Sequence, residues 1–246
     1  MTALEWQIAT VKEITLETAK VRSFTFALPA WQRHRAGQHY DLRLTAPDGY
    51  RAQRSYSIAS PPEREGEIDL TVERVHDGEV STFMHDTVVV GDRVELRGPI
   101  GGYFVWDAAT QPAPLLLVAG GSGVVPMMSM LRHRAAARSN TPARLLISSR
   151  TIDDVIYRNE LTRLASARDG LEVFHALTRT QPAGWSGYAR RIDDAMVAEV
   201  GGPLGRACLA FVCGPTALVE SAAAALERIG LPAEGIKTER FGPTGT

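Results

Sequence analysis

The chain has 246 residues, of which 44% are hydrophobic and 22% are charged. Because a usual domain has roughly 100–200 residues, we expect two domains with a packed core each and exclude an intrinsically disordered chain. Lysine and arginine total 27 against 28 for aspartate and glutamate, so no basic field is available to bind nucleic acid or an anionic membrane.

The first residues give no sign of a targeting or membrane segment, because Glu5 and Lys12 interrupt every apolar run there. The default expectation is therefore a cytoplasmic protein. The two cysteines, Cys208 and Cys213, lack the spacing of a metal or redox pair, and an iron–sulfur cluster usually takes four thiolates. No metal site is expected.

In the first half, up to about residue 106, apolar residues fall mostly on alternate positions, as at Phe24, Phe26 and Leu28. This period of two predicts half-buried β-strands. Turn sequences such as 47–49 and 91–92 separate the strands at the spacing of an antiparallel barrel or sandwich. We therefore predict an all-β domain, in which a barrel would close its own sheet edges.

The segment Arg54-Ser55-Tyr56-Ser57 alternates an arginine and a phenol with hydroxyls. In a strand, Arg54 and Tyr56 lie on one face. A cation beside an aromatic ring suits a phosphate joined to a planar heterocycle, and Ser57 offers a hydroxyl to the polar edge of that ring. The pattern predicts a flavin nucleotide, although composition alone also fits an amphipathic strand with a surface arginine.

A second candidate phosphate site is the segment 78–82, Gly-Glu-Val-Ser-Thr, before a short helix-like stretch at 83–86. Hydroxyls and unpaired N–H groups at a helix start suit an anion, but the segment also fits a plain helix cap. Together with Arg54, this segment makes two phosphate sites in the first domain. Two such sites favour FAD over FMN.

The second half has continuous apolar runs that alternate with helix-like stretches, which is typical of parallel strands buried on both faces. We expect strands at 115–119, 145–147, 173–177 and 209–212, and helices at 126–137, 153–167 and 215–229. The pattern predicts a doubly wound α/β domain. With the Pro- and Ala-rich stretch 107–114 as the linker, we place the two domains at 1–108 and 109–246.

The first apolar run of this second domain is followed by Gly120-Gly121-Ser122-Gly123 and then Pro126. Ligands of open α/β sheets bind beyond the carboxyl ends of the strands. Glycines let backbone N–H groups approach a pyrophosphate, and the next helix points its positive end at the same anion. Pro126 stands where a dinucleotide fingerprint has its third glycine, so a bare strand-to-helix turn stays an alternative.

The later strand ends carry arginines and a thiol. Ser149-Arg150 follows the second run, where an NAD site usually has an acidic residue, whereas an arginine suits the 2′-phosphate of NADPH. Thr178-Arg179 and Arg190-Arg191 add guanidiniums, although single arginines are common on surfaces. Cys213-Gly214-Pro215 ends the fourth run, and its thiol fits either a place beside a nicotinamide or a small buried residue.

Taken in order, these motifs resemble the ferredoxin–NADP reductase superfamily over essentially the whole chain. Arg54–Ser57 resembles its R-x-Y-S flavin signature, and Gly78–Ser81 its FAD pyrophosphate segment. Gly120–Pro126 with Met127 resembles the family's G-x-G-x-x-P loop, and Cys213–Pro215 its C-G-P turn. Four weak motifs in register are hard to explain by chance.

The resemblance implies two domains, an antiparallel Greek-key β-barrel that binds FAD and then an α/β doubly wound parallel-sheet domain that binds NADPH, or NADH. It implies hydride transfer from nicotinamide C4 to flavin N5. The residues implied for FAD are Arg54, Ser55, Tyr56, Ser57, Thr71, Val72, His76, Gly78, Val80, Ser81 and Phe241. Those implied for the nicotinamide dinucleotide are Gly121, Ser122, Gly123, Met127, Ser149, Arg150, Thr178, Arg179, Arg191, Cys213 and Gly214. The residues implied at the reacting atoms are Cys213, Glu239 and Ser57.

Glu239 and Phe241 are expected just after a last short strand, and the chain departs from the family at this point. Plant-type members end in an aromatic residue, whereas here the sequence continues from Gly242 to Thr246. Many relatives also append a ferredoxin domain with its own cysteines, which is not found here. The resemblance therefore implies a separate electron acceptor, a ferredoxin or an oxygenase component.

Two other functions stay open at this point. The same fold serves free-flavin and quinone reductases, whose acceptor is a small molecule. An FAD-binding electron-transfer subunit without independent NAD(P)H activity would also carry these motifs, although the arginines at the second strand end argue against it. The acceptor, the pathway and the oligomeric state do not follow from the sequence.

Overall fold

The computed structural model describes residues 4–242. Its contacts divide the chain into two compact units, one comprising the residues up to Asp107 with Met128–Ala136, the other Ala108–Met127 and the residues from Ala137 onward. The division near residue 107 falls in the expected linker. Among the described residues, no helix is long and apolar enough to cross a membrane.

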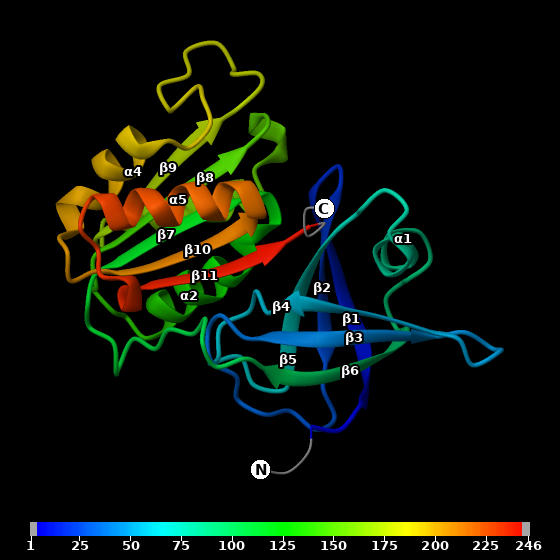
Figure 1. Cartoon of the computed structure of the whole chain (residues 1–246). Helices are drawn as coiled ribbons and strands as arrows, with labels where there is room; N and C mark the ends of the chain where they lie inside the picture. Colours follow the sequence, from blue (N-terminus) through cyan, green and yellow to red (C-terminus); the bar gives the residue numbers. More distant parts are fainter. Residues whose placement is uncertain (1–3, 243–246) are drawn as a thin grey trace. The chain divides into compact units, whose positions relative to one another are not determined.

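The first unit is a six-stranded antiparallel sheet with the strand order β4-β3-β6-β1-β2-β5 (Figure 1). The strands are β1 (Gln7–Thr18), β2 (Val21–Ala27), β3 (His39–Thr45), β4 (Arg51–Ser57), β5 (Glu67–Glu73) and β6 (Arg93–Ile100). An isolated bridge between Ile58 and Leu70 joins the two edges of the sheet. The predicted antiparallel barrel is therefore confirmed.

The core of this barrel is built from the alternating apolar residues that the sequence pattern singled out, among them Phe24, Phe26 and Leu28, which are at most 6% exposed. Helix α1 (Glu79–Asp86) follows β5 and adds Val80 and Met84 to the same core. The helix begins four residues earlier than the expected stretch 83–86. The turn that precedes it, with a left-handed backbone at Asp77 (φ 58°), already directs the chain into the helix at Glu79.

The second unit is a five-stranded parallel sheet with the order β11-β10-β7-β8-β9. Its strands are β7 (Leu115–Gly120), β8 (Ala143–Ser149), β9 (Leu171–Leu177), β10 (Leu209–Pro215) and β11 (Ile236–Phe241). The chain runs outward from β7 to β9 and then returns to β10 on the other side of β7. The carboxyl ends of β7 and β10 therefore form the switch point at which open α/β sheets bind ligands.

The helices of this half are α2 (Val124–Ala136), α3 (Arg158–Ser166), α4 (Asp194–Gly201) and α5 (Thr216–Arg228). Figure 1 shows α4 and α5 over the same face of the sheet, and their apolar residues share one core cluster with Leu116 and Val118 of β7. Helix α4 was not predicted; Asp193 caps it by accepting a hydrogen bond from the Met196 N–H at 2.9 Å.

Two helices differ from the sequence prediction, one in the residue at which it begins and the other in the unit to which most of it belongs. The helix expected at 153–167 begins only at Arg158, because Val155 is extended and Tyr157 adopts a left-handed backbone (φ 59°). Helix α2 starts in the second unit, but its residues from Met128 onward belong to the first. There the Ser129 hydroxyl donates to the Ser60 carbonyl oxygen at 2.8 Å, and Arg132 to that of Ala59 at 2.9 Å.

Candidate nucleotide-binding sites

Strand β4 carries the predicted flavin residues, and its register with β3 decides where they point. Tyr56 pairs with Tyr40 and Arg54 with Leu42, so Arg54 and Tyr56 do lie on one face. Tyr56 packs against the barrel core, and burial raises the pKa of its phenol to about 12. Arg54 is exposed, with one N–H donated to the neighbouring Gln53 carbonyl. A neutral ring beside an exposed cation fits a flavin phosphate.

The two serines of this motif lie on the opposite face of β4. The Ser55 hydroxyl donates to Asp41 Oδ1 at 2.7 Å, and Arg97 donates to Oδ2 at 2.7 Å. Burial opposes ionisation of Asp41, but these two hydrogen bonds lower the pKa of its carboxyl below the usual value. Asp41, itself bonded to Arg97, therefore fixes β4 through Ser55, on the face opposite Arg54 and Tyr56. Neither residue was predicted from the sequence, although an aspartate between Tyr40 and Leu42 in an alternating strand was a usable signal.

The segment before α1 is a tight turn with little room for a side chain at position 78. A Cβ added to Gly78 would lie 2.5 Å from the Ser81 Oγ. That hydroxyl donates to the Gly78 carbonyl oxygen and accepts from the Val75 N–H, both at 3.1 Å. Within residues 4–242 no side chain caps the start of α1, so the first-turn N–H groups, including that of Val80, can receive an anion.

Three further residues of the expected flavin set stand apart from this turn. Val72 is part of the barrel core, and the hydroxyl of Thr71 lies 2.8 Å from that of Ser23. Only the backbone of these two residues can face a ligand. His76 is almost fully exposed beside Asp77, with 2.8 Å between Nδ1 and Oδ2.

At the switch point, the loops after β7 and β10 pack backbone against backbone. A Cβ on Gly123 would lie 2.1 Å from the Cys213 carbonyl oxygen, and one on Gly214 would lie 3.1 Å from the Gly120 nitrogen. Gly121 has a left-handed backbone (φ 55°), which glycine adopts without strain. The side chain of Met127 is fully buried. The glycine loop therefore presents backbone rather than side chains, as a pyrophosphate site requires.

Replacing Gly123 tests this packing. We expect Gly123→Ala to lower the free energy of unfolding by about 1–3 kcal/mol, because the contacting atoms are backbone and cannot turn aside. The Michaelis constants for NADPH and NADH should both rise. Gly202→Ala is the matched control, since its Cβ would meet nothing within 4 Å. Equal urea-unfolding midpoints for the two variants would contradict the assignment.

Cys213 and Glu239 are direct neighbours on the parallel strands β10 and β11. Cys213 is 4% exposed, and burial, with a contribution from the charge of Glu239, raises the pKa of its thiol well above the usual value. Glu239 is half-buried, and burial raises the pKa of its carboxyl from 4.5 to about 7. Glu239 and Phe241 lie within β11 rather than after it, and Phe241 ends the strand beside Pro215.

The arginine-bearing strand ends also come together. The Thr178 N–H and hydroxyl donate to the Ser149 carbonyl oxygen at 3.0 and 3.2 Å, and the Arg179 N–H donates to that of Arg150 at 2.9 Å. The two segments therefore continue the β8–β9 ladder side by side. Among the described residues, the buried Ser149 hydroxyl has no hydrogen-bond partner. An orphaned buried hydroxyl at a strand end is what a bound ribose or phosphate would satisfy.

The two adjacent arginines after β9 have different environments. The guanidinium of Arg190 is bonded to Asp193 at 2.5 and 3.3 Å and lies over the ring of Tyr188. Arg191 is exposed and takes no part in that pair. Of the two, Arg191 is therefore the one available for a phosphate.

Comparison with known proteins assigns each of the two units to a domain family. Residues 8–105 match the oxidoreductase FAD-binding domain family and residues 117–224 the oxidoreductase NAD-binding domain family. The chain is 35% identical over 237 residues to ferredoxin–NADP reductase B of Sorangium cellulosum, covering 94% of this chain and 91% of that protein. It is 30% identical over 236 residues to a glycine betaine monooxygenase reductase subunit of Chromohalobacter salexigens, covering 94% of this chain and 63% of that protein.

Among solved structures, the FAD/NAD-binding domain of a nitric oxide dioxygenase from Vibrio cholerae shares the fold, with a TM-score of 0.85 at 24% identity over 96% of this chain and 99% of that one. The barrel and the parallel sheet thus correspond to an oxidoreductase FAD-binding domain and an oxidoreductase NAD-binding domain. The chain belongs to the ferredoxin–NADP reductase superfamily. The predicted family, the two-domain fold and the FAD and NAD(P) cofactors are confirmed.

Proposed function

We propose that this protein takes hydride from NADPH through FAD and passes the electrons to a ferredoxin or an oxygenase component. The observation that carries the NADPH preference is the edge of the second sheet, where Arg150, Arg179 and the orphaned Ser149 hydroxyl come together. The relatives named above, a ferredoxin–NADP reductase and a monooxygenase reductase subunit, support the proposed acceptors.

In the barrel, the proposed FAD ligands act by charge and shape. Arg54 neutralises a phosphate, and Tyr56 offers the flat apolar face of its ring. The first-turn N–H groups of α1, at Val80 and Ser81, bind the second phosphate. FAD supplies the chemistry, because it accepts two electrons as hydride and can release them one at a time.

In the second unit, the proposed roles follow from the hydrogen-bond donors of the glycine loop and the arginines, and from the protonation states of Cys213 and Glu239. The N–H groups of Gly121–Gly123 bind the pyrophosphate, while Arg150, Arg179 and Arg191 bind the 2′-phosphate. Because burial keeps the Cys213 thiol protonated, it serves as a small neutral wall for the nicotinamide and not as a nucleophile. Glu239 supplies a carboxyl beside it that gains or loses a proton near pH 7.

The decisive experiment is anaerobic rapid mixing of the FAD-loaded protein with NADPH or NADH, followed by addition of candidate acceptors. We expect faster flavin reduction at low NADPH than at low NADH, and electron uptake by a ferredoxin or an oxygenase component. No reduction by either dinucleotide would favour an electron-transfer subunit. Loss of FAD during gel filtration and reduction of free flavins or quinones alone would favour a small-molecule reductase. The cytoplasmic location stays a prediction.

A further inference from the structure

The loop 178–193, which joins β9 to α4, carries Arg179 near its start and Arg191 near its end. Both arginines are proposed to bind the 2′-phosphate, although most of the loop separates them in sequence. From Arg179 to Gly187 every residue is exposed except Trp185, which is half-buried. A large aromatic side chain that turns inward within an exposed loop anchors that loop by burying apolar surface.

The indole of Trp185 has two partners next to the edge of the sheet. Its Nε1–H donates to the Tyr188 carbonyl oxygen at 3.2 Å. Its ring packs edge-to-face against the imidazole of His175 on β9, with 6.3 Å between the ring centroids and 64° between the ring planes. The backbone N–H of Trp185 donates to the Pro182 carbonyl oxygen at 3.1 Å, so the loop turns back toward the sheet just before the indole.

The Tyr188 carbonyl oxygen also joins the loop to β9. It accepts from the Leu177 N–H at 2.9 Å, while the Tyr188 N–H donates to the His175 carbonyl oxygen at 3.0 Å. These two bonds form an isolated parallel bridge at the edge of the sheet. A carbonyl oxygen has two lone pairs, so it can accept from the indole as well. Trp185 therefore reinforces the bridge that fixes the chain shortly before Arg191.

The close packing of the indole depends on a glycine. A Cβ added to Gly187 would lie 2.5 Å from the Trp185 Cζ2 atom and 2.8 Å from the His175 carbonyl oxygen. Gly187 is thus enclosed between the indole and the backbone of β9. A side chain at this position would displace the indole from its partners.

The two arginines differ in how their backbone is held. The Arg179 N–H donates to the Arg150 carbonyl oxygen at 2.9 Å and so continues the β8–β9 ladder. Arg191 lies beyond that ladder, and its place depends on the bridge at Tyr188 that precedes it in the chain. Without the indole, Arg179 would stay in place, whereas the backbone that carries Arg191 would be free to move away from it.

We propose that Trp185 is a positioning residue for NADPH, because it holds Arg191 within reach of the 2′-phosphate that Arg150 and Arg179 bind. The inference rests on the proposed preference for NADPH. Because NADH lacks the 2′-phosphate, Trp185 is expected to affect the binding of NADPH and not that of NADH. It is also expected to leave hydride transfer unchanged.

The test is steady-state dye reduction by the FAD-loaded protein with each dinucleotide. Trp185→Ala should raise the Michaelis constant for NADPH about tenfold, the loss of one contact to a charged group, and change kcat and the Michaelis constant for NADH by less than about twofold. Trp185→Phe keeps a ring beside His175 but lacks the N–H, so the rise for NADPH should be only about threefold. Gly187→Ala should have the same selective effect as Trp185→Ala. Ser186→Ala, at an exposed neighbour in the same loop, is the control and should change neither constant.

A double variant separates positioning from a general structural role. In an Arg191→Ala background, Trp185→Ala should not raise the Michaelis constant for NADPH further, because the arginine that it positions is absent. Additive effects of the two substitutions would overturn the proposal. If Trp185→Ala does not fold, Trp185→Phe and Gly187→Ala decide by the same comparison.

Two other outcomes would overturn the proposal while leaving the proposed function intact, provided that Arg150→Ala impairs NADPH selectively. One is an equal rise of the Michaelis constants for NADPH and NADH in Trp185→Ala. The other is an unchanged constant for NADPH in both Trp185→Ala and Gly187→Ala. If the wild-type protein shows no preference for NADPH, or Arg150→Ala affects both dinucleotides equally, the proposed preference fails together with the role of Trp185.

Discussion

Glu239→Gln is expected to stabilise the protein at pH 8 by about 2–3 kcal/mol and to have no such effect at pH 4. Burial raises the pKa of Glu239 from 4.5 to about 7 in the folded chain. Each pKa unit corresponds to about 1.4 kcal/mol, here reduced because the carboxyl is partly exposed. Since the raised pKa means that the folded chain binds this proton more tightly than the unfolded one, stability is lost as the pH rises from about 4.5 to 7.

Urea unfolding of the wild type and the variant at the two pH values measures this effect. The matched control is Glu220→Gln, an exposed carboxylate paired with Arg240 at 2.7 Å, which should change stability by less than about 0.5 kcal/mol at either pH. The same Glu239→Gln variant should remove any inflection near pH 7 in the rate of flavin reduction. An unchanged inflection would assign it to another group.

Arg150→Ala is expected to raise the Michaelis constant for NADPH by about 10- to 100-fold and to leave that for NADH nearly unchanged. A hydrogen bond between charged partners contributes about 1.5–3 kcal/mol, and only NADPH carries the 2′-phosphate that would receive it. Steady-state reduction of a dye with each dinucleotide provides the comparison.

The neighbouring arginines give this experiment an internal control. Arg190 is committed to Asp193, so Arg190→Ala should leave the NADPH-to-NADH ratio within about twofold of the wild type. Arg191→Ala should shift that ratio in the same direction as Arg150→Ala. Equal effects of Arg150→Ala on both dinucleotides would refute the 2′-phosphate assignment.

Local sequence patterns were sufficient for the features that depend on one segment. The apolar run at 115–119 with its glycine loop predicted β7 and the switch-point turn, and alternation placed Arg54 and Tyr56 on one face. Both follow from the period of a single strand or from the conformational freedom of glycine. The cofactors do not follow from periodicity; the chemistry of the motif residues and the family resemblance predicted them.

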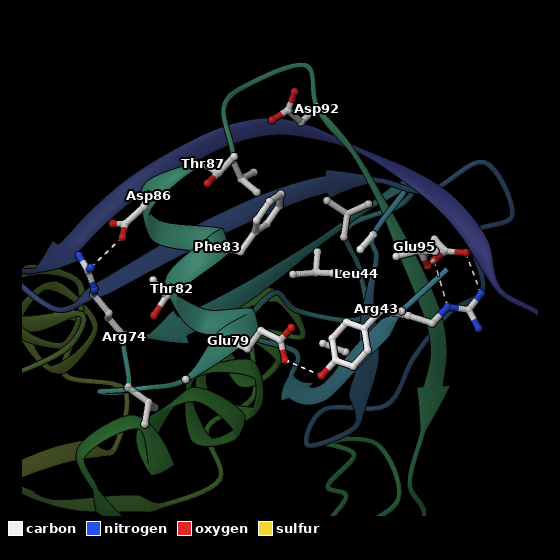
Figure 2. Close-up of a pocket in the computed structure, with 18 of the residues that line it drawn as sticks. Arg43, Leu44, Arg74, Glu79, Thr82, Phe83, Asp86, Thr87, Asp92 and Glu95 are labelled. Carbon is white, nitrogen blue, oxygen red and sulfur yellow. Dashed lines mark hydrogen bonds and ion pairs between the residues drawn. The ribbon is translucent and has the colours of Figure 1, made fainter. Parts of the chain in front are cut away.

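Features that depend on a distant partner were not predictable. Ser55 binds Asp41, and Tyr50 donates a hydrogen bond to Glu79 across 29 positions of sequence (Figure 2), so neither the direction of the Ser55 hydroxyl nor that of the Tyr50 hydroxyl follows from a local pattern. The sequence does not distinguish Arg190 from Arg191, because only the structure shows that Arg190 is paired with Asp193. The fold could be predicted because the same hydrophobic periods recur along each strand and helix. The site depends instead on strand register and on single contacts between residues distant in sequence.

The membership of α2 in both units limits how the protein can be divided. A hybrid joined at residue 108 would exchange Ser129 and Arg132 together with the nucleotide domain, and the barrel would lose the donors to the Ser60 and Ala59 carbonyl oxygens. Glu63 would also lose the imidazole of His133, 2.8 Å away. A functional hybrid must therefore keep Met128–Ala136 together with the barrel. The part of the chain that has to be exchanged as a whole consists of two separate segments of sequence.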